Sequence, residues 1–364
     1  MHAAVLHRTG DTTLDVVDAE TVSFGPGRVR VKMHRAGLCH SDVSAMSGVL
    51  THPAPFVPGH EGAGEVVEVG EGVTHVKPGD RVIVCWMPPC DTCASCKKGE
   101  GHLCRSGYRN LGTPNFSTAA GGTDEEIVPG MLGAGTFAEE TVIAAYAAIP
   151  IPDDVPYDIA ALIGCGVTTG IGAALNTARV KPGSSVVVIG LGGVGISILQ
   201  GAKVAGAARI IAVDPTPNRR EWALKFGATE AVAPEDLAET VKRLTGGFGV
   251  DYAFEAVGKT GTLRAAYDAT RLGGTVCLVG AGSRTDLPDI SMAELVMSEK
   301  AILPSFYGGD DIRRTYATII DLWRAGRIDL DSMITHHVPL TDINEAIRQM
   351  HTGEALRTVI DIVG

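Results

Sequence analysis

The stretch Ser185-Val-Val-Val-Ile-Gly190-Leu-Gly-Gly-Val-Gly195 decides the fold of this chain. Its run of β-branched residues predicts a buried parallel strand, and the spacing Gly190-x-Gly192-x-x-Gly195 predicts a tight turn into a helix. Glycine permits that turn and the close approach of a pyrophosphate, which the helix N-terminus would bind. Asp214 ends the next expected strand and could bind a ribose diol while repelling a 2′-phosphate, which favours NAD over NADP. The alternative is a glycine-rich turn in an α/β fold that binds no dinucleotide.

Strands and helices alternate around this stretch. We expect strands over 185–190, 209–214, 230–233, 250–255 and 274–280, with helices over 193–205, 218–226, 234–244 and 261–271 between them. Such alternation predicts βαβ units and a parallel sheet. It places the chain in the α/β class, with a doubly wound, Rossmann-type domain.

The first 160 residues have a different texture, rich in Gly, Pro and short Val-rich runs, and predict a β-rich lobe. At 364 residues the chain is too long for one ordinary core. Helices expected over 312–325 and 342–351, and a final strand over 358–363, suggest that the chain returns to the first lobe. We therefore predict a discontinuous first domain, 1–166 with 311–364, and an NAD-binding domain, 167–310.

Four cysteines in one short loop predict a metal site. Their spacing is C-x2-C-x2-C-x7-C, and the residues are Cys90, Cys93, Cys96 and Cys104. Four thiolates at this spacing can surround one Zn²⁺ tetrahedrally, as a structural zinc site requires. The alternatives are a redox cluster or disulfides.

Composition and charge exclude several classes of protein. Hydrophobic residues make up 45% of the chain and charged residues 20%, a normal balance for a soluble globular protein. The net charge of −11 argues against nucleic acid or an anionic membrane as a partner. The four cysteines outside the loop are isolated, and the first residues do not have the pattern of a signal peptide. We therefore expect free thiols and a reducing, cytoplasmic location.

These features, together with Gly59-His60-Glu61-Gly62, resemble the zinc-dependent medium-chain alcohol dehydrogenases. The resemblance covers nearly the whole chain. It implies a GroES-like catalytic lobe and a catalytic zinc held by Cys39, His60 and Cys165, in addition to the structural zinc, so two zinc ions per chain. Taken singly, Cys39 and His60 would be interpreted as a core thiol and a loop histidine. We also expect a homodimer or homotetramer.

The resemblance assigns roles to the neighbours of the zinc ligands. It places the Glu61 carboxylate near the metal, and it makes Asp42 the group that orients the ligand imidazole. Ser41 matches the hydroxyl that removes the proton of the alcohol. The family often has a histidine at position 44 to pass that proton onward, and here Ser44 leaves this outer step unassigned.

Cofactor and substrate contacts follow from the same resemblance. His40 and Arg357 match residues that face the cofactor phosphates. Thr169 and Val194 match positions behind the nicotinamide ring, although both could be packing residues. The glycine turn, which includes Gly193, would hold the pyrophosphate, and Arg219 could reach the adenosine ribose or be an exposed helix residue. Trp86 matches a position in the substrate pocket, and its alternative is a core tryptophan.

The resemblance also narrows the branch of the family. The long segment between Arg105 and Thr136 resembles the animal-type branch. The glutathione-dependent formaldehyde branch has acidic residues where this chain has Leu50-Thr-His52, which argues against S-hydroxymethylglutathione as the substrate. We predict an NAD-dependent zinc alcohol dehydrogenase that acts on a small alcohol or its aldehyde or ketone. The alternatives are a thiol-cofactor-dependent formaldehyde dehydrogenase and, more remotely, a zinc-knuckle nucleic-acid-binding protein.

Overall fold

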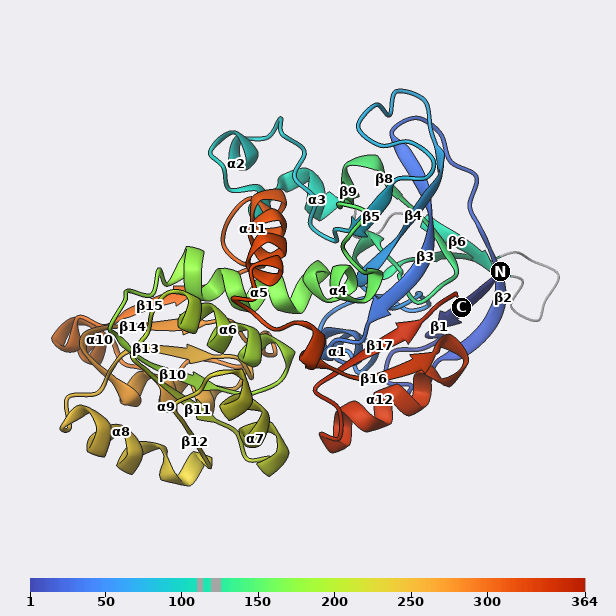
Figure 1. Ribbon diagram of the computed structural model, residues 1–364. Helices are drawn as coiled ribbons and strands as arrows, with labels where there is room; N and C mark the ends of the chain where they lie inside the picture. Colours follow the sequence, from blue (N-terminus) through green and yellow to red (C-terminus); the bar gives the residue numbers. More distant parts are fainter. Residues whose placement is uncertain (110–113, 119–125, 364) are drawn as a thin grey trace. The chain divides into compact units, whose positions relative to one another are not determined.

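The computed structural model describes residues 1–109, 114–118 and 126–363. The chain forms two compact units (Figure 1). The first unit comprises 1–165, 311–316 and 330–364, and the second comprises 166–310 and 317–329. The predicted domain division stays a prediction. The two divisions differ chiefly at 317–329, which clusters with the second unit.

The second unit is built on a six-stranded parallel sheet with the strand order β12-β11-β10-β13-β14-β15. This is the order of a doubly wound dinucleotide-binding sheet, and it reverses between β10 and β13. The predicted α/β class is therefore confirmed. The strands are β10 (Ser185–Ile189), β11 (Arg209–Val213), β12 (Glu230–Val232), β13 (Val250–Glu255), β14 (Thr270–Leu278) and β15 (Ala301–Pro304).

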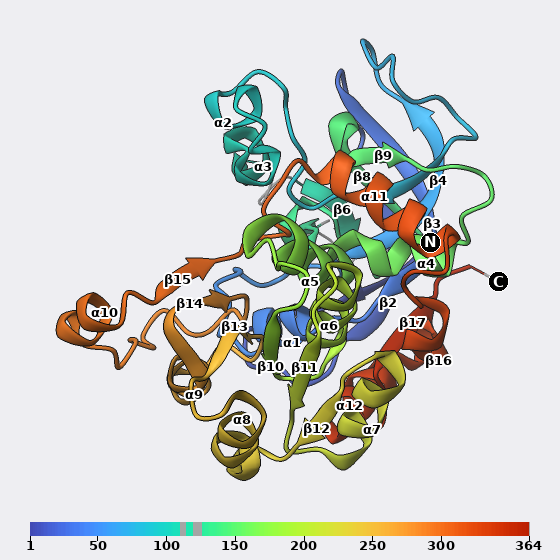
Figure 2. The same cartoon turned by 60° about the vertical axis from the view of Figure 1, so that its left-hand side comes forward.

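Helices cover both faces of this sheet. Residues of α8 and α9 pack with those of β10 and β11 in one buried cluster, and α6 lies on the opposite face (Figure 2). Because both faces are covered, β10 consists of a continuous apolar run that is almost fully buried. The helices are α5 (Thr168–Gly172), α6 (Gly193–Val204), α7 (Pro217–Phe226), α8 (Leu237–Thr245), α9 (Thr260–Ala269) and α10 (Met292–Ser298), and α11 (Ile312–Arg324) contributes its later residues.

The first unit is β-rich, as predicted. Its larger sheet has the order β16-β17-β3-β4-β5-β9, with β8 also pairing with β3, and its smaller sheet has the order β1-β2-β6-β7. The larger sheet comprises β3 (Arg28–Gly37), β4 (Glu61–Val69), β5 (Arg81–Val84), β8 (Glu140–Ala144), β9 (Ala148–Pro150), β16 (Ile334–Pro339) and β17 (Arg357–Asp361). The smaller sheet comprises β1 (His2–Val5), β2 (Asp15–Thr21), β6 (Pro114–Thr118) and β7 (Glu126–Pro129). Strand β17 pairs with β3, so the end of the chain does complete the first unit.

Short helices connect these strands. They are α1 (His40–Met46), α2 (Ala94–Lys97), α3 (Arg105–Arg109), α4 (Tyr157–Leu162) and α12 (Ile343–Thr352). The helical run Tyr157–Thr177 is the one candidate membrane span among the described residues, by length and composition only. Of its most apolar window, 83% is buried inside the structure, and the core helix of a soluble protein passes the same test. A second apolar stretch, 184–202, is long enough to suggest a membrane span, but it forms β10 followed by most of α6, as the sequence predicts.

Local differences from the sequence-based expectations concern one helix end and two elements that were not predicted. Helix α9 ends at Ala269 rather than at 271, because Thr270 already pairs with Val250 as the first residue of β14. Helix α10 and strand β15 were not predicted. Of the long segment between Arg105 and Thr136, residues 110–113 and 119–125 lie outside the described residues.

Candidate functional site

A buried group of four side chains lies in the first unit. It consists of Cys39, which precedes α1, His60 and Glu61 at the start of β4, and Cys165 in the π-helical turn 163–167. One ligand atom of each residue lies within 4.8 Å of the others. All four are almost fully buried. The structure thus brings together the three residues that were predicted as ligands of the catalytic zinc.

Asp42 fixes the direction of the His60 ring. The Asp42 side chain is fully buried, and its Oδ1 lies 2.9 Å from Nδ1 of His60. It also accepts the backbone N–H groups of Cys39, at 3.0 Å, and of Gly59, at 3.1 Å. One carboxylate therefore holds the segment after β3, at Cys39, and the segment before β4, at Gly59. Its contact with Nδ1 leaves Nε2 of His60 to face the thiols. That Nε2 atom is buried and has no hydrogen-bond partner among the described residues.

Glu61 and Arg357 form a buried ion pair beside this group. Arg357 begins β17. Gly37 ends β3 and pairs with Glu61 of β4, and a Cβ atom on Gly37 would collide with the Glu61 carboxylate. Burial raises the pKa of Glu61 to about 7, against the lowering influence of Arg357. Arg357 is thus not an exposed residue at a strand edge. Its predicted phosphate contact stays a prediction.

The two thiols of the group share their protons. A hydrogen bond from Cys165 holds the pKa of the Cys39 thiol well below its usual range, and the same contact raises the pKa of Cys165. A divalent metal ion would deprotonate both, because a thiol that coordinates a metal is ionised. Two sulfur atoms and one unpaired imidazole nitrogen, all buried, are a donor set that suits Zn²⁺.

The remaining predicted residues of this region lie around α1 and β5. Ser41 is half-buried and His40 is exposed, both in the first turn of α1. The His40 ring lies edge-on to the His351 ring, with a centroid distance of 6.3 Å. Trp86 is buried, and its ring lies edge-on to the His60 ring, also at 6.3 Å. The predicted roles of these residues remain predictions.

The second cysteine group is contained in one loop of the first unit. The four Sγ atoms, from Cys90, Cys93, Cys96 and Cys104, lie within 4.8 Å of one another. In a tetrahedral zinc site with Zn–S bonds of about 2.3 Å, the sulfur atoms would lie about 3.8 Å apart, so a small contraction suffices. The hydroxyls of Ser106 and Thr92 lower the pKa of Cys90 to about 5, whereas burial raises the pKa of Cys96 to about 12. None of the eight cysteines forms a disulfide.

Arg313 ties this loop to the segment that begins α11, within the first unit. Its Nη1 donates to Asp91 Oδ2 at 2.8 Å, and its Nη2 donates to Asp311 Oδ2 at 2.8 Å. Asp91 lies between two of the cysteines and has a left-handed backbone, with φ of 59°. Arg314 adds a weaker contact to the carbonyl oxygen of Gly99 at 3.4 Å.

The glycine turn of the second unit has the geometry that the sequence predicts. Gly190 has φ of 92°, and a Cβ atom on Gly195 would collide with the Gly190 carbonyl oxygen. At Gly192 a Cβ atom would meet nothing within 4 Å, so the backbone is open to a ligand there. Gly192 caps α6, whose first residues are Gly193 and Val194. An exposed glycine backbone at a helix N-terminus fits a pyrophosphate.

Asp214 follows β11 directly and is almost fully buried. Its two oxygens accept the backbone N–H groups of Leu191 and Thr216, each at 2.9 Å. Arg219 lies on α7, with Nη1 3.7 Å from Asp214 Oδ2. Asp214 therefore helps to shape the glycine turn, and its predicted contact with the ribose stays a prediction. Thr169 and Val194 are both half-buried, in α5 and α6 respectively.

Known proteins resemble this chain along its whole length. The families described as alcohol dehydrogenase GroES-like domain and as zinc-binding dehydrogenase match residues 25–153 and 193–324, respectively. The S-(hydroxymethyl)glutathione dehydrogenase of Escherichia coli O1:K1 / APEC is 37% identical over 360 residues, covering 95% of this chain and 96% of that protein.

Two solved structures resemble this chain along its full length. Benzyl alcohol dehydrogenase from Acinetobacter calcoaceticus has a TM-score of 0.91 and 28% identity, over 100% of this chain and 99% of that one. An alcohol dehydrogenase zinc-binding domain protein from Burkholderia ambifaria has a TM-score of 0.92 and 30% identity, with the same coverage.

This chain belongs to the zinc-dependent medium-chain alcohol dehydrogenase family. It is an NAD-dependent oxidoreductase that requires zinc. The family relationship agrees with the donor sets of the two cysteine groups and with the glycine turn, which the structure shows independently.

Two residues of this dehydrogenase that the sequence did not single out hold its sites in shape. Arg313 is one, since it clamps the cysteine loop through Asp91. Glu255 is the other. It is fully buried at the end of β13, which pairs with β10, the strand that leads into the glycine turn. A buried acidic residue at the end of an apolar strand was the available signal for Glu255. No local pattern connects Arg313 with a loop more than 200 positions away.

Proposed function

We propose that this dehydrogenase transfers hydride between a small alcohol, or the corresponding aldehyde or ketone, and NAD at a zinc held by Cys39, His60 and Cys165. The observation that supports this most strongly is the buried group itself, with two thiols and one unpaired imidazole nitrogen directed at one point. Three protein ligands leave a zinc ion one open position for a substrate oxygen. Such an ion supplies Lewis-acid polarisation, which lowers the pKa of an alcohol.

The protein groups around this point would orient ligands and move a proton. Asp42 accepts from Nδ1 of His60, fixes the tautomer and raises the basicity of Nε2. Ser41, two residues after Cys39, would take the hydroxyl proton of the substrate and pass it toward the surface. Because Ser44 stands where the family often has histidine, the outer step would use water or another histidine.

NAD would bind across the glycine turn of the second unit and accept the hydride. Asp214 would bind the adenosine ribose and exclude a 2′-phosphate. Comparing kcat/KM for NAD and NADP tests this assignment. We expect a strong preference for NAD, and Asp214→Gly should narrow the gap mainly by relieving repulsion of the 2′-phosphate. Equal values for the two cofactors in the wild type would contradict the ribose assignment.

A thiol adduct of formaldehyde is the second candidate substrate. The similarity to S-(hydroxymethyl)glutathione dehydrogenase over nearly the whole chain favours it. The segment Leu50-Thr-His52 argues against glutathione as the thiol, because it contains no acidic residue to bind the charged amino group of the tripeptide.

Two rate measurements separate the candidates. NADH formation is measured with primary, secondary, allylic and aromatic alcohols, and with formaldehyde in the presence and absence of low-molecular-weight thiols, glutathione among them. The alcohol proposal expects turnover of at least one free alcohol and no stimulation by any of these thiols. Turnover that requires a thiol would replace it with the second candidate.

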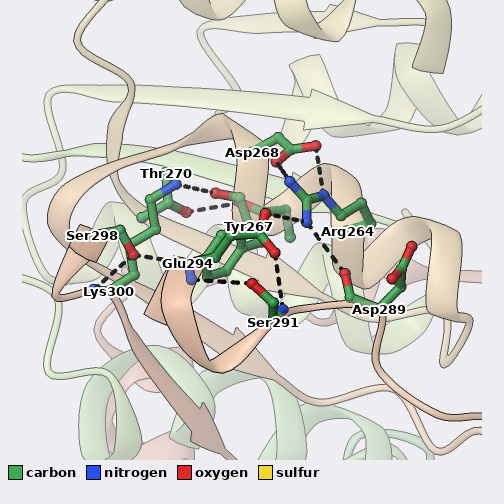
Figure 3. Close-up of polar contacts among 10 residues, drawn as sticks. Arg264, Tyr267, Asp268, Thr270, Asp289, Ser291, Glu294, Ser298 and Lys300 are labelled. Carbon is green, nitrogen blue, oxygen red and sulfur yellow. Dashed lines mark hydrogen bonds and ion pairs between the residues drawn. The ribbon is translucent and has the colours of Figure 1, made fainter. Parts of the chain in front are cut away.

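A homo-oligomer is supported by the edge of the second unit's sheet. Strand β15 is the last strand of that sheet, and α10 lies beside it in both views (Figures 1 and 2). Polar contacts hold α10 to α9, including Arg264 Nη1 to Glu294 Oε1 at 2.7 Å and Tyr267 to Ser298 at 2.7 Å (Figure 3). Three apolar side chains of α10 are instead exposed, namely Met292, Val296 and Met297.

An unpaired strand edge beside exposed apolar side chains is the type of surface that a second copy can cover. Light scattering after size-exclusion chromatography should therefore give a multiple of the 37.9 kDa chain mass. Val296→Asp should shift the protein toward the monomer, and Leu224→Asp on α7 serves as the control. A wild-type mass of one chain would contradict the proposal.

A reducing, cytoplasmic location is supported by the eight free thiols, all of which belong to the proposed zinc sites or to buried positions in the core. Fractionation of the native cell should place the protein in the cytoplasm. Recovery from the medium or from membranes would contradict this.

A further inference from the structure

Glu255 is a fully buried carboxylate that organises a turn at the carboxyl end of the sheet. Its Oε1 accepts the backbone N–H groups of Val257, at 2.9 Å, and of Gly258, at 2.8 Å, and the hydroxyl of Thr262, at 2.7 Å. Its Oε2 is buried and has no hydrogen-bond partner among the described residues. Burying a carboxylate with one oxygen unsatisfied is costly, so a stability role alone does not explain this side chain.

Two turns meet at Glu255. Its carbonyl oxygen accepts the N–H groups of Val279 and Gly280, each at 2.9 Å, at the end of the neighbouring strand β14. A Cβ atom on Gly280 would lie 2.7 Å from Glu255 Oε2 and would collide with the backbone nitrogen of Gly258. The turn after β13 and the turn after β14 are therefore packed backbone against backbone, with the carboxylate between them.

The first of these turns also contacts the glycine turn. The N–H of Ala256 donates to the Ile189 carbonyl oxygen at 2.9 Å, and a Cβ atom on Gly190 would lie 2.6 Å from Cγ2 of Val257. Asp214 has the equivalent position on the other side of β10, where it accepts the N–H of Leu191. The glycine turn is thus held between two buried carboxylates that end the two neighbouring strands, β11 and β13.

In a doubly wound sheet a dinucleotide lies across the carboxyl ends of the strands at the point where the order reverses, here between β10 and β13. The β11 side, with Asp214, takes the adenosine ribose, which leaves the β13 side for the other half of the cofactor. We propose that Glu255 is a positioning residue for the nicotinamide half of NAD, acting through the turn 256–258. This inference rests on the proposed binding of NAD to the second unit.

The test compares the dissociation constants of AMP and of NAD, so that the two halves of the cofactor are examined separately. AMP carries only the adenosine half, so its Kd reports on the Asp214 side, whereas the Kd of NAD reports on both sides. In the zinc-loaded enzyme, Glu255→Gln should leave the Kd of AMP within about twofold of wild type. It should raise the Kd of NAD about tenfold. The bonds that hold the turn 256–258 would then go to a neutral acceptor instead of a charged one, so the turn would be held less firmly for the nicotinamide half. Calorimetric titration of each variant measures both constants.

A matched control and a milder variant keep the test decisive. Asp251→Asn changes the other carboxylate of β13, at the opposite end of the strand, where it accepts from Ser185 and Arg271, and should leave the ratio of the two Kd values unchanged. Thr262→Val removes one donor to Glu255 and should shift the ratio in the same direction by a smaller factor. It decides the matter if Glu255→Gln does not fold.

Equal losses of AMP and NAD affinity in Glu255→Gln would overturn the inference, because a general defect of the domain predicts them. So would an unchanged Kd for NAD. If wild type bound AMP but not NAD, or neither, the proposed cofactor assignment would fail first, and the inference would fall with it.

Discussion

The two cysteine groups of the first unit offer similar donor atoms but are built in opposite ways. Cys90, Cys93, Cys96 and Cys104 come from one 15-residue loop, and most of them are partly exposed. Cys39, His60 and Cys165 come from three distant segments and are almost fully buried. A local loop can bind a metal and close around it, whereas a buried site needs the whole fold to bring its ligands together. The first design suits stability, and the second suits chemistry that excludes water.

Each group also has its own supporting side chain, an inner one for the buried group and an outer one for the loop. Asp42 supports the buried group by three hydrogen bonds, all to backbone or imidazole N–H groups inside the unit. Arg313 supports the loop from outside, through one half-exposed guanidinium shared by two carboxylates. If the comparison holds, changes at the buried group will remove activity, and changes at the loop will mainly remove stability.

Cys39→Ser is the strongest test of the buried group. The variant should lose one zinc per chain and should lose turnover by about 10³-fold or more, since Lewis-acid catalysis contributes several kcal/mol. Its far-ultraviolet circular dichroism should be unchanged. Metal analysis and NADH formation measure the two effects. Cys277→Ala, at a buried thiol in β14, is the control and should keep both zinc ions.

Cys93→Ser should show the converse pattern. The loop should lose its zinc ion, and the midpoint of thermal unfolding should fall by about 10 °C or more, because metal binding contributes directly to folding. The folded fraction should keep most of its turnover at low temperature. A fully metallated wild type with only one zinc per chain would contradict both this prediction and the previous one.

The sequence predicted the loop site from spacing alone, and it predicted the dinucleotide turn from spacing and its flanking strand. Cys39, His60 and Cys165 were different, because each is an isolated residue that only the family resemblance connects. Nothing local shows that residues 39, 60 and 165 meet, since the meeting depends on the register of β3 with β4 and on the turn at 163–167.

Other parts of the fold could not be predicted for related reasons. Helix α10 and strand β15 follow a polar segment with Pro288 and few β-branched residues, and β15 has only four residues. The pairing of β15 with β14 is set by tertiary contacts that a short edge strand does not encode. Glu255 and Arg313 were missed because their partners are backbone groups or residues of a distant loop.

Ser41→Ala tests whether the buried group has its own proton path. Turnover should fall by about 10²–10⁴-fold, the usual contribution of a positioned acid–base group, while the zinc content stays intact. Ser44→His is the companion variant; it should be tolerated and should raise turnover if outer proton release limits the rate. The measurement is kcat against pH with one good alcohol. Near-wild-type turnover of Ser41→Ala, with hydride transfer rate-limiting, would make Ser41 a turn residue.

Asp42→Asn tests the inner support. The asparagine can still accept one hydrogen bond but loses the charge that holds His60, so zinc affinity at the buried site should fall about 10- to 100-fold. Competition with a chelator measures the affinity. Asp361→Asn is the matched control, because Asp361 contacts Nδ1 of His337 at 3.1 Å in a similar pair on the surface. Equal zinc affinities for Asp42→Asn and wild type would remove the distinction between the two supports.

Arg313→Gln tests the outer support and should have the smallest effect. Arg313 is 42% exposed, so solvent screens its ion pairs, and the expected loss of stability is about 1 kcal/mol. The hydrogen bond from Arg313 lowers the pKa of Asp91. Burial raises the pKa of Asp311, but the hydrogen bonds and positive charge of Arg313, together with the charge of Arg314, lower it on balance. Both folded-state pKa values lie below their ordinary value of 3.8, so the contribution is full above that value and is lost as the pH falls below it. The difference in unfolding free energy between wild type and variant should therefore be the same at pH 8 and pH 6.

Zinc release from Arg313→Gln to a chelator should be a few-fold faster than from wild type at the cysteine loop and unchanged at the buried group. Arg243→Gln, which breaks a surface pair with Glu230 in the second unit, is the control. If Arg313→Gln also accelerated release from the buried group, the two sites would not be independent, and the contrast between them would have to be abandoned.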